Sequence, residues 1–200
     1  MPFAVKITID QAAFQRAAEK SKKSANKLKQ NLAGALYDTA KHIRTDMSSR
    51  IREHVAIKKQ DVDKFIEIDR PNPGKLVAGV ILRKSERIPL KHFGARQTKK
   101  GVTYKIAKSA QAASLMRNPK RTLGPSSSGR EKITDAFGPN IPRLGGNVFR
   151  RLGKSRLPII KLFGPSAWGV FVRLGLRKQL KKDAQAYLND RLQRRILYQK

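Results

Sequence analysis

The side chains best suited to chemistry are few in this 200-residue chain, and their spacing matches no catalytic pattern. The three histidines are His42, His54 and His92, and none lies three or four residues from another, so they cannot form a helical metal site. Cysteine is absent, which removes disulfides, thiolate nucleophiles and cysteine-bound zinc. We therefore predict that the protein holds neither a metal nor a cofactor.

Two short motifs imitate known sites, but each lacks residues that its chemistry requires. Gly124 and Gly129 have the separation of the glycines in a phosphate-binding loop, yet residues 130–131 are Arg-Glu where Lys and Ser or Thr are needed. Ser24 and Lys27 fit a Ser-x-x-Lys pattern, but they lie within a helical pattern and have no companion motif. Neither motif predicts an active site.

Asp61 and Asp63 allow two interpretations. They could begin a metal site, or they could be acidic residues that favour the start of a helix. No third ligand stands nearby, which favours the helix. Because the 14 carboxylates are scattered along the chain, we predict that the protein is not an enzyme.

Charge is the extreme feature of the composition. The chain has 45 Lys plus Arg against 14 Asp plus Glu, a formal net charge of +31. Self-repulsion of this size opposes compaction, so an anionic partner is expected, either nucleic acid or acidic protein subunits. A membrane is disfavoured because no run of about 18 apolar residues is present, and the first residues do not resemble a signal peptide.

The positive charge concentrates in the centre of the chain. Between Arg83 and Arg156 there are 19 Lys plus Arg and three acids. Two interpretations remain open: a groove for a nucleic-acid backbone without sequence preference, or a basic face that docks on acidic subunits or lines a channel. Aromatic residues are sparse there, so a stacking platform for single strands is not expected.

Hydrophobic periodicity predicts a long helix near the N-terminus. Residues 3–9 alternate like a short strand, and Asp10 then resembles a helix cap. Apolar or small residues recur at steps of three or four from Phe14 to Ile51, which predicts an amphipathic helix over residues 10–52 that could kink at Gly34. Such a helix would extend roughly 60 Å.

The rest of the chain predicts a small sheet followed by a C-terminal helix. We expect a short helix at 59–66, a turn at 71–74, an antiparallel pair of strands at 76–82 and 102–107, and further strands at 147–151 and 157–163. Residues 109–146 are rich in Ser, Pro and Gly and predict a loop insertion, extended or poorly packed over 109–132. Apolar steps predict the final helix at 165–198. The fold class is therefore α+β, with one mostly antiparallel sheet spanning 76–163 and a single domain over 1–200.

Several segments, taken in order, resemble the prophage minor tail protein Z family. They are Ile88–Val102, Ile133–Phe137, Gly146–Arg151, Gly153–Ile159 and Gly164–Ser166. Each motif is weak alone, but their order and spacing together are fairly specific, and the resemblance covers most of residues 10–198. The chain departs from the family pattern at 109–146, where it is longer.

The resemblance implies a structural tail-completion (neck) protein of a long-tailed bacteriophage. It implies a place at the head-proximal end of the virion tail, in head–tail joining, after assembly in the host cytoplasm. The implied partners are other tail or neck subunits (tail terminator, tail tube, tape measure or head connector) and genomic DNA in the channel. The implied assembly is a ring of several copies, with six expected. No catalytic residues are implied, and the alternative function is non-specific nucleic-acid binding.

In physical terms the resembling motifs read as structural. Pro89 and Gly94 would shape a turn between strands, while Phe137, Phe149 and Ile159 would fill the core under the sheet. Six basic residues would lie at strand ends on one surface that contacts DNA or a protein partner: Lys99, Lys100, Arg150, Arg151, Lys154 and Arg156.

Overall fold

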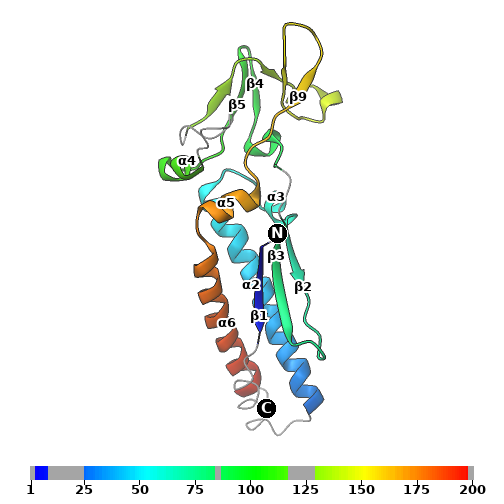
Figure 1. Ribbon diagram of the computed structural model, residues 1–200, viewed down its shortest axis with the longest axis vertical. Helices are drawn as coiled ribbons and strands as arrows, with labels where there is room; N and C mark the ends of the chain where they lie inside the picture. The colour runs from blue at the N-terminus through cyan, green and yellow to red at the C-terminus, as the bar shows by residue number, and fades with distance from the viewer. Residues whose placement is uncertain (1–2, 9–24, 84–86, 117–128, 198–200) are drawn as a thin grey trace. The chain divides into compact units, whose positions relative to one another are not determined.

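The computed structural model confirms an α+β protein and describes residues 3–8, 25–83, 87–116 and 129–197 (Figure 1). The chain divides into two compact units. Unit 1 comprises residues 1–48, 65–83 and 175–200, and unit 2 comprises 49–64 and 84–174. The boundary at Ser48 falls inside a helix, so one helix contributes to both units. That both units act as one domain stays a prediction.

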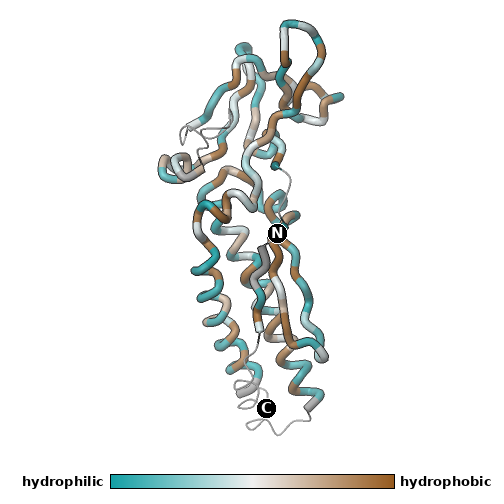
Figure 2. Tube along the Cα trace, viewed as in Figure 1, coloured by the Kyte–Doolittle hydropathy of each residue, from teal (hydrophilic) through white to brown (hydrophobic). Residues whose placement is uncertain are grey.

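Unit 1 contains an antiparallel sheet of three strands, β1 (Phe3–Thr8), β2 (Ile66–Asp69) and β3 (Val77–Leu82). The strand order is β1-β3-β2, so β3 is central and its two edges are both occupied. The predicted turn at 71–74 is confirmed, because Asn72 pairs with Lys75 between β2 and β3. Figure 2 shows β3 as a mostly hydrophobic strand, and four of its six residues are buried.

The helix α2 (Ala25–His54) carries the predicted apolar stripe. Its buried positions recur at helical spacing, and the large apolar ones are Leu28, Leu32, Leu36, Ile43, Met47 and Ile51. The helix continues through Gly34 without interruption. The predicted residues 10–24 lie outside the described part of the chain.

The C-terminal region forms two helices where one was predicted from 165 to 198. Ser166 caps α5 (Ala167–Arg173) by accepting a hydrogen bond from the Gly169 backbone N–H at 3.0 Å. Gly175 then adopts a left-handed conformation with φ +64°, which ends a helix, and α6 (Arg177–Leu197) follows. The predicted stripe of α6 is confirmed, since Leu176, Leu180, Ala184, Leu188 and Leu192 are buried.

Unit 2 contains two further three-stranded antiparallel sheets, so the expected single sheet is wrong. One is β4 (Arg96–Thr98), β5 (Gly101–Tyr104) and β6 (Glu131–Ile133), and the other is β7 (Ala136–Phe137), β8 (Phe149–Arg151) and β9 (Ile159–Lys161). The predicted pairing of strands 76–82 and 102–107 does not occur. The strand β3 instead pairs with β1 and β2, whereas β5 pairs with its sequence neighbour β4 and with β6. Pairing two strands joined by a short loop, as β4 and β5 are, costs less loop-closure entropy than pairing strands far apart in the sequence.

The described residues of the predicted insertion at 109–146 include regular elements, which corrects the loop interpretation there. It contains α4 (Ala110–Met116), with Ala112, Ala113 and Met116 buried, and it supplies β6, β7 and the 3-10 turn η2 (Pro142–Leu144). The Ser, Pro and Gly residues around these elements concealed them, although the residues of α4 themselves are mostly good helix formers. Residues 117–128 lie outside the described part.

Two smaller expectations also need correction. The helix α3 (Lys59–Asp63) is shorter than the predicted 59–66, because Ile66 begins β2. Phe137, Phe149 and Ile159 are half-buried. The fully packed core of unit 2 instead includes Phe93, Val102, Tyr104, Val148 and Leu162.

Candidate partner-binding surface

The first part of the candidate surface is the tip of the β4–β5 hairpin. Lys99 and Lys100 form the two-residue turn, and both are exposed. Two side chains of β4 hold the turn in place. The Thr98 hydroxyl donates to the Gly101 carbonyl at 2.9 Å, and the Gln97 amide donates to the same oxygen at 3.1 Å. Gly101 has φ +120°, and a Cβ there would collide with backbone atoms of β6, so only glycine fits. The two ammonium groups therefore extend from an ordered turn.

The second part is the loop between β8 and β9. Arg151, Lys154 and Arg156 are exposed, while Arg150 is half-buried. The Arg151 guanidinium donates to the Arg156 carbonyl at 2.6 Å and lies over the Phe137 ring, 5.1 Å from its centroid. Arg151 thus closes the loop as well as contributing charge, a role that sequence reasoning did not anticipate.

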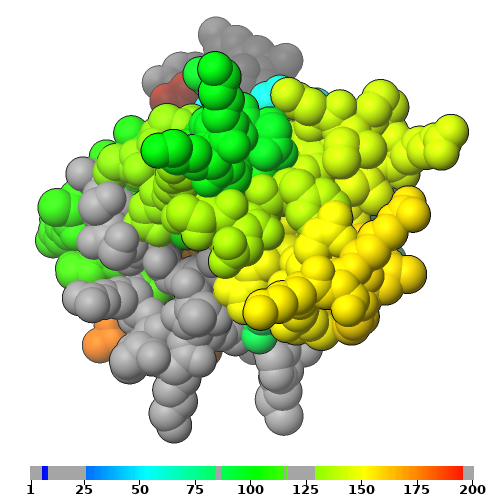
Figure 3. All heavy atoms as spheres, turned by 90° about the horizontal axis from the view of Figure 1, so that it is seen from above, coloured from blue at the N-terminus to red at the C-terminus, as the bar shows by residue number. Residues whose placement is uncertain are grey.

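The two parts belong to the same unit and are joined by hydrogen bonding between the sheets. The Gln97 side-chain oxygen on β4 accepts from the Gly138 backbone N–H beside β7 at 3.2 Å. Figure 3 shows the hairpin tip (green) and the β8–β9 loop (yellow) on one face, with residues 130–150 between them. All six predicted basic residues therefore lie in unit 2, and five of them are exposed. Their contact with DNA or a partner stays a prediction.

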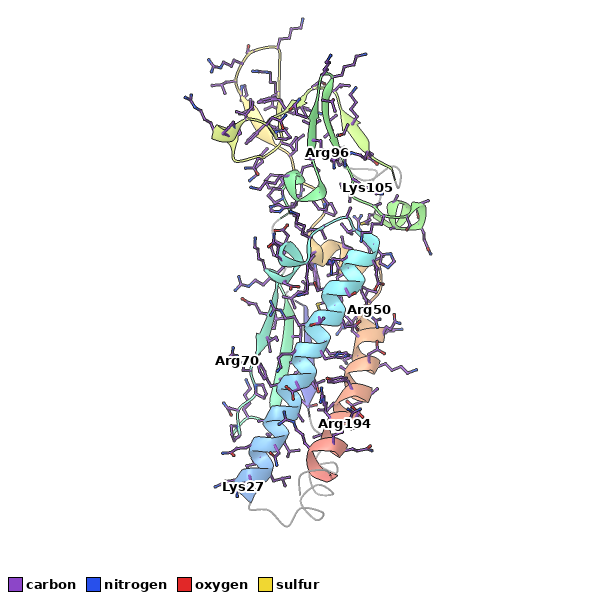
Figure 4. The ribbon with its side chains drawn as sticks, turned by 180° about the vertical axis from the view of Figure 1, so that it is seen from behind. Lys27, Arg50, Arg70, Arg96, Lys105 and Arg194 are labelled. Carbon is purple, nitrogen blue, oxygen red and sulfur yellow. The ribbon has the colours of Figure 1, made fainter. Side chains whose placement is uncertain are left out.

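Neighbouring charges extend this surface along the β4–β5 hairpin. Figure 4 shows Arg96 and Lys105 on the hairpin below its tip. Arg130 donates to the Gly94 carbonyl at 2.6 Å and to the Thr103 carbonyl at 3.1 Å, so it clamps the turn after η1 (Leu90–Phe93) to β5. Burial, together with the charge of Arg96, lowers the pKa of Arg130.

One acidic residue of unit 2, Asp61, is buried. Asp61 accepts a hydrogen bond from His92 Nδ1 at 2.9 Å and from Lys64 at 3.4 Å, whereas Asp63 pairs with Lys59 at 2.5 Å. Burial by itself raises the pKa of Asp61, but the bonds to His92 and Lys64 outweigh it and hold that pKa below the usual range. The two aspartates pair with different side chains, and the described residues contain no group of three potential metal ligands.

Sequence reasoning missed exposed apolar side chains on this surface. Leu152 and Leu157 flank the polar residues 153–156, and they are 59% and 67% exposed. The pattern had placed Leu157 within a strand, whereas β9 begins at Ile159. The polar run between the two leucines was the available signal that both lie in a turn.

Comparison with protein-family models, curated proteins and solved structures finds no match to this chain. No helix among the described residues is long and apolar enough to cross a membrane.

Proposed function

We propose that this protein is a structural tail-completion subunit of a long-tailed bacteriophage, acting at the head-proximal end of the tail in head–tail joining. In this proposal the chain is no enzyme, several copies surround the tail axis, and basic surfaces meet acidic tail or neck subunits or the DNA that enters the channel. The proposal rests on the ordered resemblance of residues 88–166 to the minor tail protein Z family and on the physical role of those residues.

The observation that carries the proposal is that resembling motifs far apart in sequence build one junction. The Leu90 backbone N–H donates to the Leu162 carbonyl at 3.0 Å, and the Gly164 N–H donates to the Ile88 carbonyl at 2.8 Å. A Cβ on Gly164 would collide with the Phe93 ring, so the glycine lets the two segments approach. These motif residues serve packing and backbone hydrogen bonding, as a scaffold that presents the basic loops requires.

Electrostatics agrees with a place in a larger assembly. A chain with a net charge of +31 gains stability from acidic neighbours, and copies around an axis would concentrate positive potential on the facing wall. The exposed Lys99 and Lys100 are suited to this contact, because hydrogen bonds from the Thr98 and Gln97 side chains to the Gly101 carbonyl already hold the turn.

The test is removal of the gene from the phage or prophage that carries it, with complementation in trans. We expect electron microscopy to show heads and tails that fail to join without the protein, and joined particles when the wild-type chain is supplied. Infectious particles at normal yield without the protein would refute the proposal.

A more selective experiment complements with the double variant Lys99→Glu, Lys100→Glu. The variant should fold, because both side chains are exposed, but should reduce the yield of joined particles. Its matched control is Lys178→Glu, Lys181→Glu, a reversal of two exposed lysines on α6. If the Lys99→Glu, Lys100→Glu variant joins heads to tails at the normal yield, the role proposed for the hairpin tip is refuted.

The second candidate is a non-specific nucleic-acid-binding protein, which the exposed lysines and arginines of unit 2 favour. A free binder should hold a DNA duplex with an affinity that falls steeply as salt rises. Fluorescence anisotropy with duplexes of unrelated sequence measures this. Sequence-independent binding at physiological salt, together with normal particle assembly in the deletion strain, would favour this second function.

A further inference from the structure

The exposed large hydrophobic side chains of the described residues gather on one part of unit 2. Five such residues stand out, and four of them belong to the β7-β8-β9 sheet and the loops that adjoin it: Ile141, Leu152, Leu157 and Ile160. The fifth, Val172, lies on α5. Exposed apolar residues scattered singly need no explanation, but a group on one hairpin marks a contact surface.

Strand register places part of this group on one face of the β8–β9 hairpin. Arg150 is paired with Ile160, and Leu152 donates its N–H to the Pro158 carbonyl at 3.1 Å. Because side chains alternate along a strand, Val148 and Leu162 share this face with Ile160 and Leu152. Val148 and Leu162 are buried, so the core of the unit continues outward as an apolar strip that becomes exposed toward the tip.

Two hydrogen bonds across the β8–β9 loop hold the tip of the hairpin in one conformation. The Arg151 guanidinium donates to the Arg156 carbonyl at 2.6 Å across the loop, and the Leu152–Pro158 bond closes its base. An ordered loop loses little conformational entropy on binding, which favours recognition by Leu152 and Leu157.

The rim of the strip is positively charged. Lys154 and Arg156 lie between the two leucines in sequence and are exposed, and Arg150 lies on the strip itself. A complementary partner therefore has an apolar centre surrounded by acidic side chains. A second copy fits poorly, because the whole chain has only 14 acids against 45 basic residues.

Two other classes of partner fit less well. Phosphates could pair with Lys154 and Arg156, but they would leave Leu152 and Leu157 in water. A lipid bilayer could take up the leucines, but β9 is an edge strand of its sheet, and hydrocarbon cannot satisfy its outward backbone groups. A protein can satisfy them by adding a strand to that edge.

We propose that the β8–β9 hairpin docks into an acid-rimmed apolar site on a different protein chain. Leu152 and Ile160 on the strip, together with Leu157 in the loop that joins the two strands, fill the apolar centre. Lys154 and Arg156 pair with the acidic rim, and the edge of β9 that no described strand pairs with accepts the partner's backbone. This inference rests on the proposed function only for the statement that the partner is another tail or neck subunit.

The experiment places a photo-crosslinking amino acid, p-benzoyl-phenylalanine, at position 157 of the full-length chain, expressed from its own gene. The matched control carries it at position 172, because Val172 is 53% exposed but lies away from the hairpin on α5. Mass spectrometry then identifies the cross-linked segment. We expect position 157 to capture one segment of another protein that combines acidic and apolar residues, and position 172 not to capture it.

A synthetic peptide of that segment provides the quantitative arm. We expect anisotropy to show that Leu157→Ser and the double variant Lys154→Glu, Arg156→Glu each weaken peptide binding by about tenfold or more. Val172→Ser should leave it unchanged, and circular dichroism should show all variants folded. Equal binding by wild type and hairpin variants would overturn the proposal.

Other results of the cross-link also overturn the proposal. These are capture only of DNA, only of a second copy, only of lipid, or of nothing at position 157. Vesicles of equimolar phosphatidylcholine and phosphatidylglycerol serve as the lipid probe, and Leu157-dependent binding to them alone would count against a protein partner.

The two proposals can fail separately. An acidic segment from a protein outside any virion would uphold the docking site and refute the tail assignment. If head–tail joining requires the chain but is unaffected by Leu157→Ser, the tail assignment would be upheld and the docking site refuted.

Discussion

At the scale of single residues, close packing explains why particular side chains cannot be exchanged. Gly164 touches the Phe93 ring at the point where its backbone bonds to Ile88. Gly153 in the β8–β9 loop has nothing within 4 Å of where its Cβ would lie. The same substitution at the two sites therefore separates the effect of contact from the loss of glycine's flexibility.

We expect Gly164→Ala to lower the free energy of unfolding by roughly 1–3 kcal/mol, because the added methyl overpacks a buried aromatic contact. Gly153→Ala should change it by less than about 0.5 kcal/mol. Urea unfolding followed by circular dichroism measures both. An unchanged midpoint for Gly164→Ala would mean that the Phe93 ring moves aside freely.

The second residue-scale prediction concerns Asp61, whose pKa lies below the usual value of 3.8 for an aspartate. The stability that comes from its ionised form is fully present above about pH 4 and is lost as pH falls through the lower folded-state pKa. We expect Asp61→Asn to destabilise the protein by about 1–3 kcal/mol at neutral pH, because His92 and Lys64 lose their charged partner.

The difference between wild type and Asp61→Asn should shrink as pH falls through the lowered pKa of the wild-type carboxyl, because that carboxyl then becomes protonated. Urea midpoints measured between pH 7 and pH 2 test this. The control is Asp135→Asn, an exposed acid in the same unit, which should behave like wild type throughout. A difference that grows toward low pH would contradict the assigned sign.

At the scale of elements, unit 1 is held by contacts between α2 and α6. The Arg195 guanidinium pairs with Asp38 at 2.5 Å and lies against Gly34. A Cβ at position 34 would collide with this guanidinium. His42 stacks on Tyr187, with ring centroids 3.9 Å apart. Gly34, predicted as a possible kink, instead allows the second helix to place a charged group against the first.

We expect Arg195→Gln to lower the free energy of unfolding by about 1 kcal/mol, because a partly buried, charged hydrogen bond is lost. Burial raises the pKa of Asp38, but bonds from Lys41 and Arg195 hold it below its usual value, so the variant should also lose less stability in acid. Arg194→Gln is the matched control. Its pair with Asp190 is exposed and should contribute less than about 0.5 kcal/mol.

At the scale of the whole molecule, the net charge of +31 dominates. Mutual repulsion is strongest at low ionic strength, where the Debye length is long. We expect the urea midpoint of the isolated protein to rise as sodium chloride is added at neutral pH. Potassium chloride should give the same rise at equal ionic strength. A midpoint that falls with salt would mean that attractive ion pairs outweigh repulsion in the isolated chain.

The sequence by itself determined what depends on local pattern. Apolar steps located α2 and the stripe of α6, because helical periodicity is imposed by one buried face. Alternation located β1, a continuous apolar run located β3, and a short β-type segment located β8. The Pro-Asn-Pro-Gly run located the turn at 71–74. Basic residues at 99–100 and 150–156 were recognised as a surface, because charge this dense cannot be buried unpaired.

Tertiary structure alone decided which strands pair and where apolar residues remain exposed. The sequence could not reveal that both edges of β3 are occupied, so it joined strands that belong to different sheets. It also left α4 and β6 unpredicted, because the Ser, Pro and Gly residues around them indicated a loop. Leu157 was predicted to lie in a strand over 157–163, because it begins an apolar run in the sequence. Only the fold shows that the hairpin carries it out into solvent.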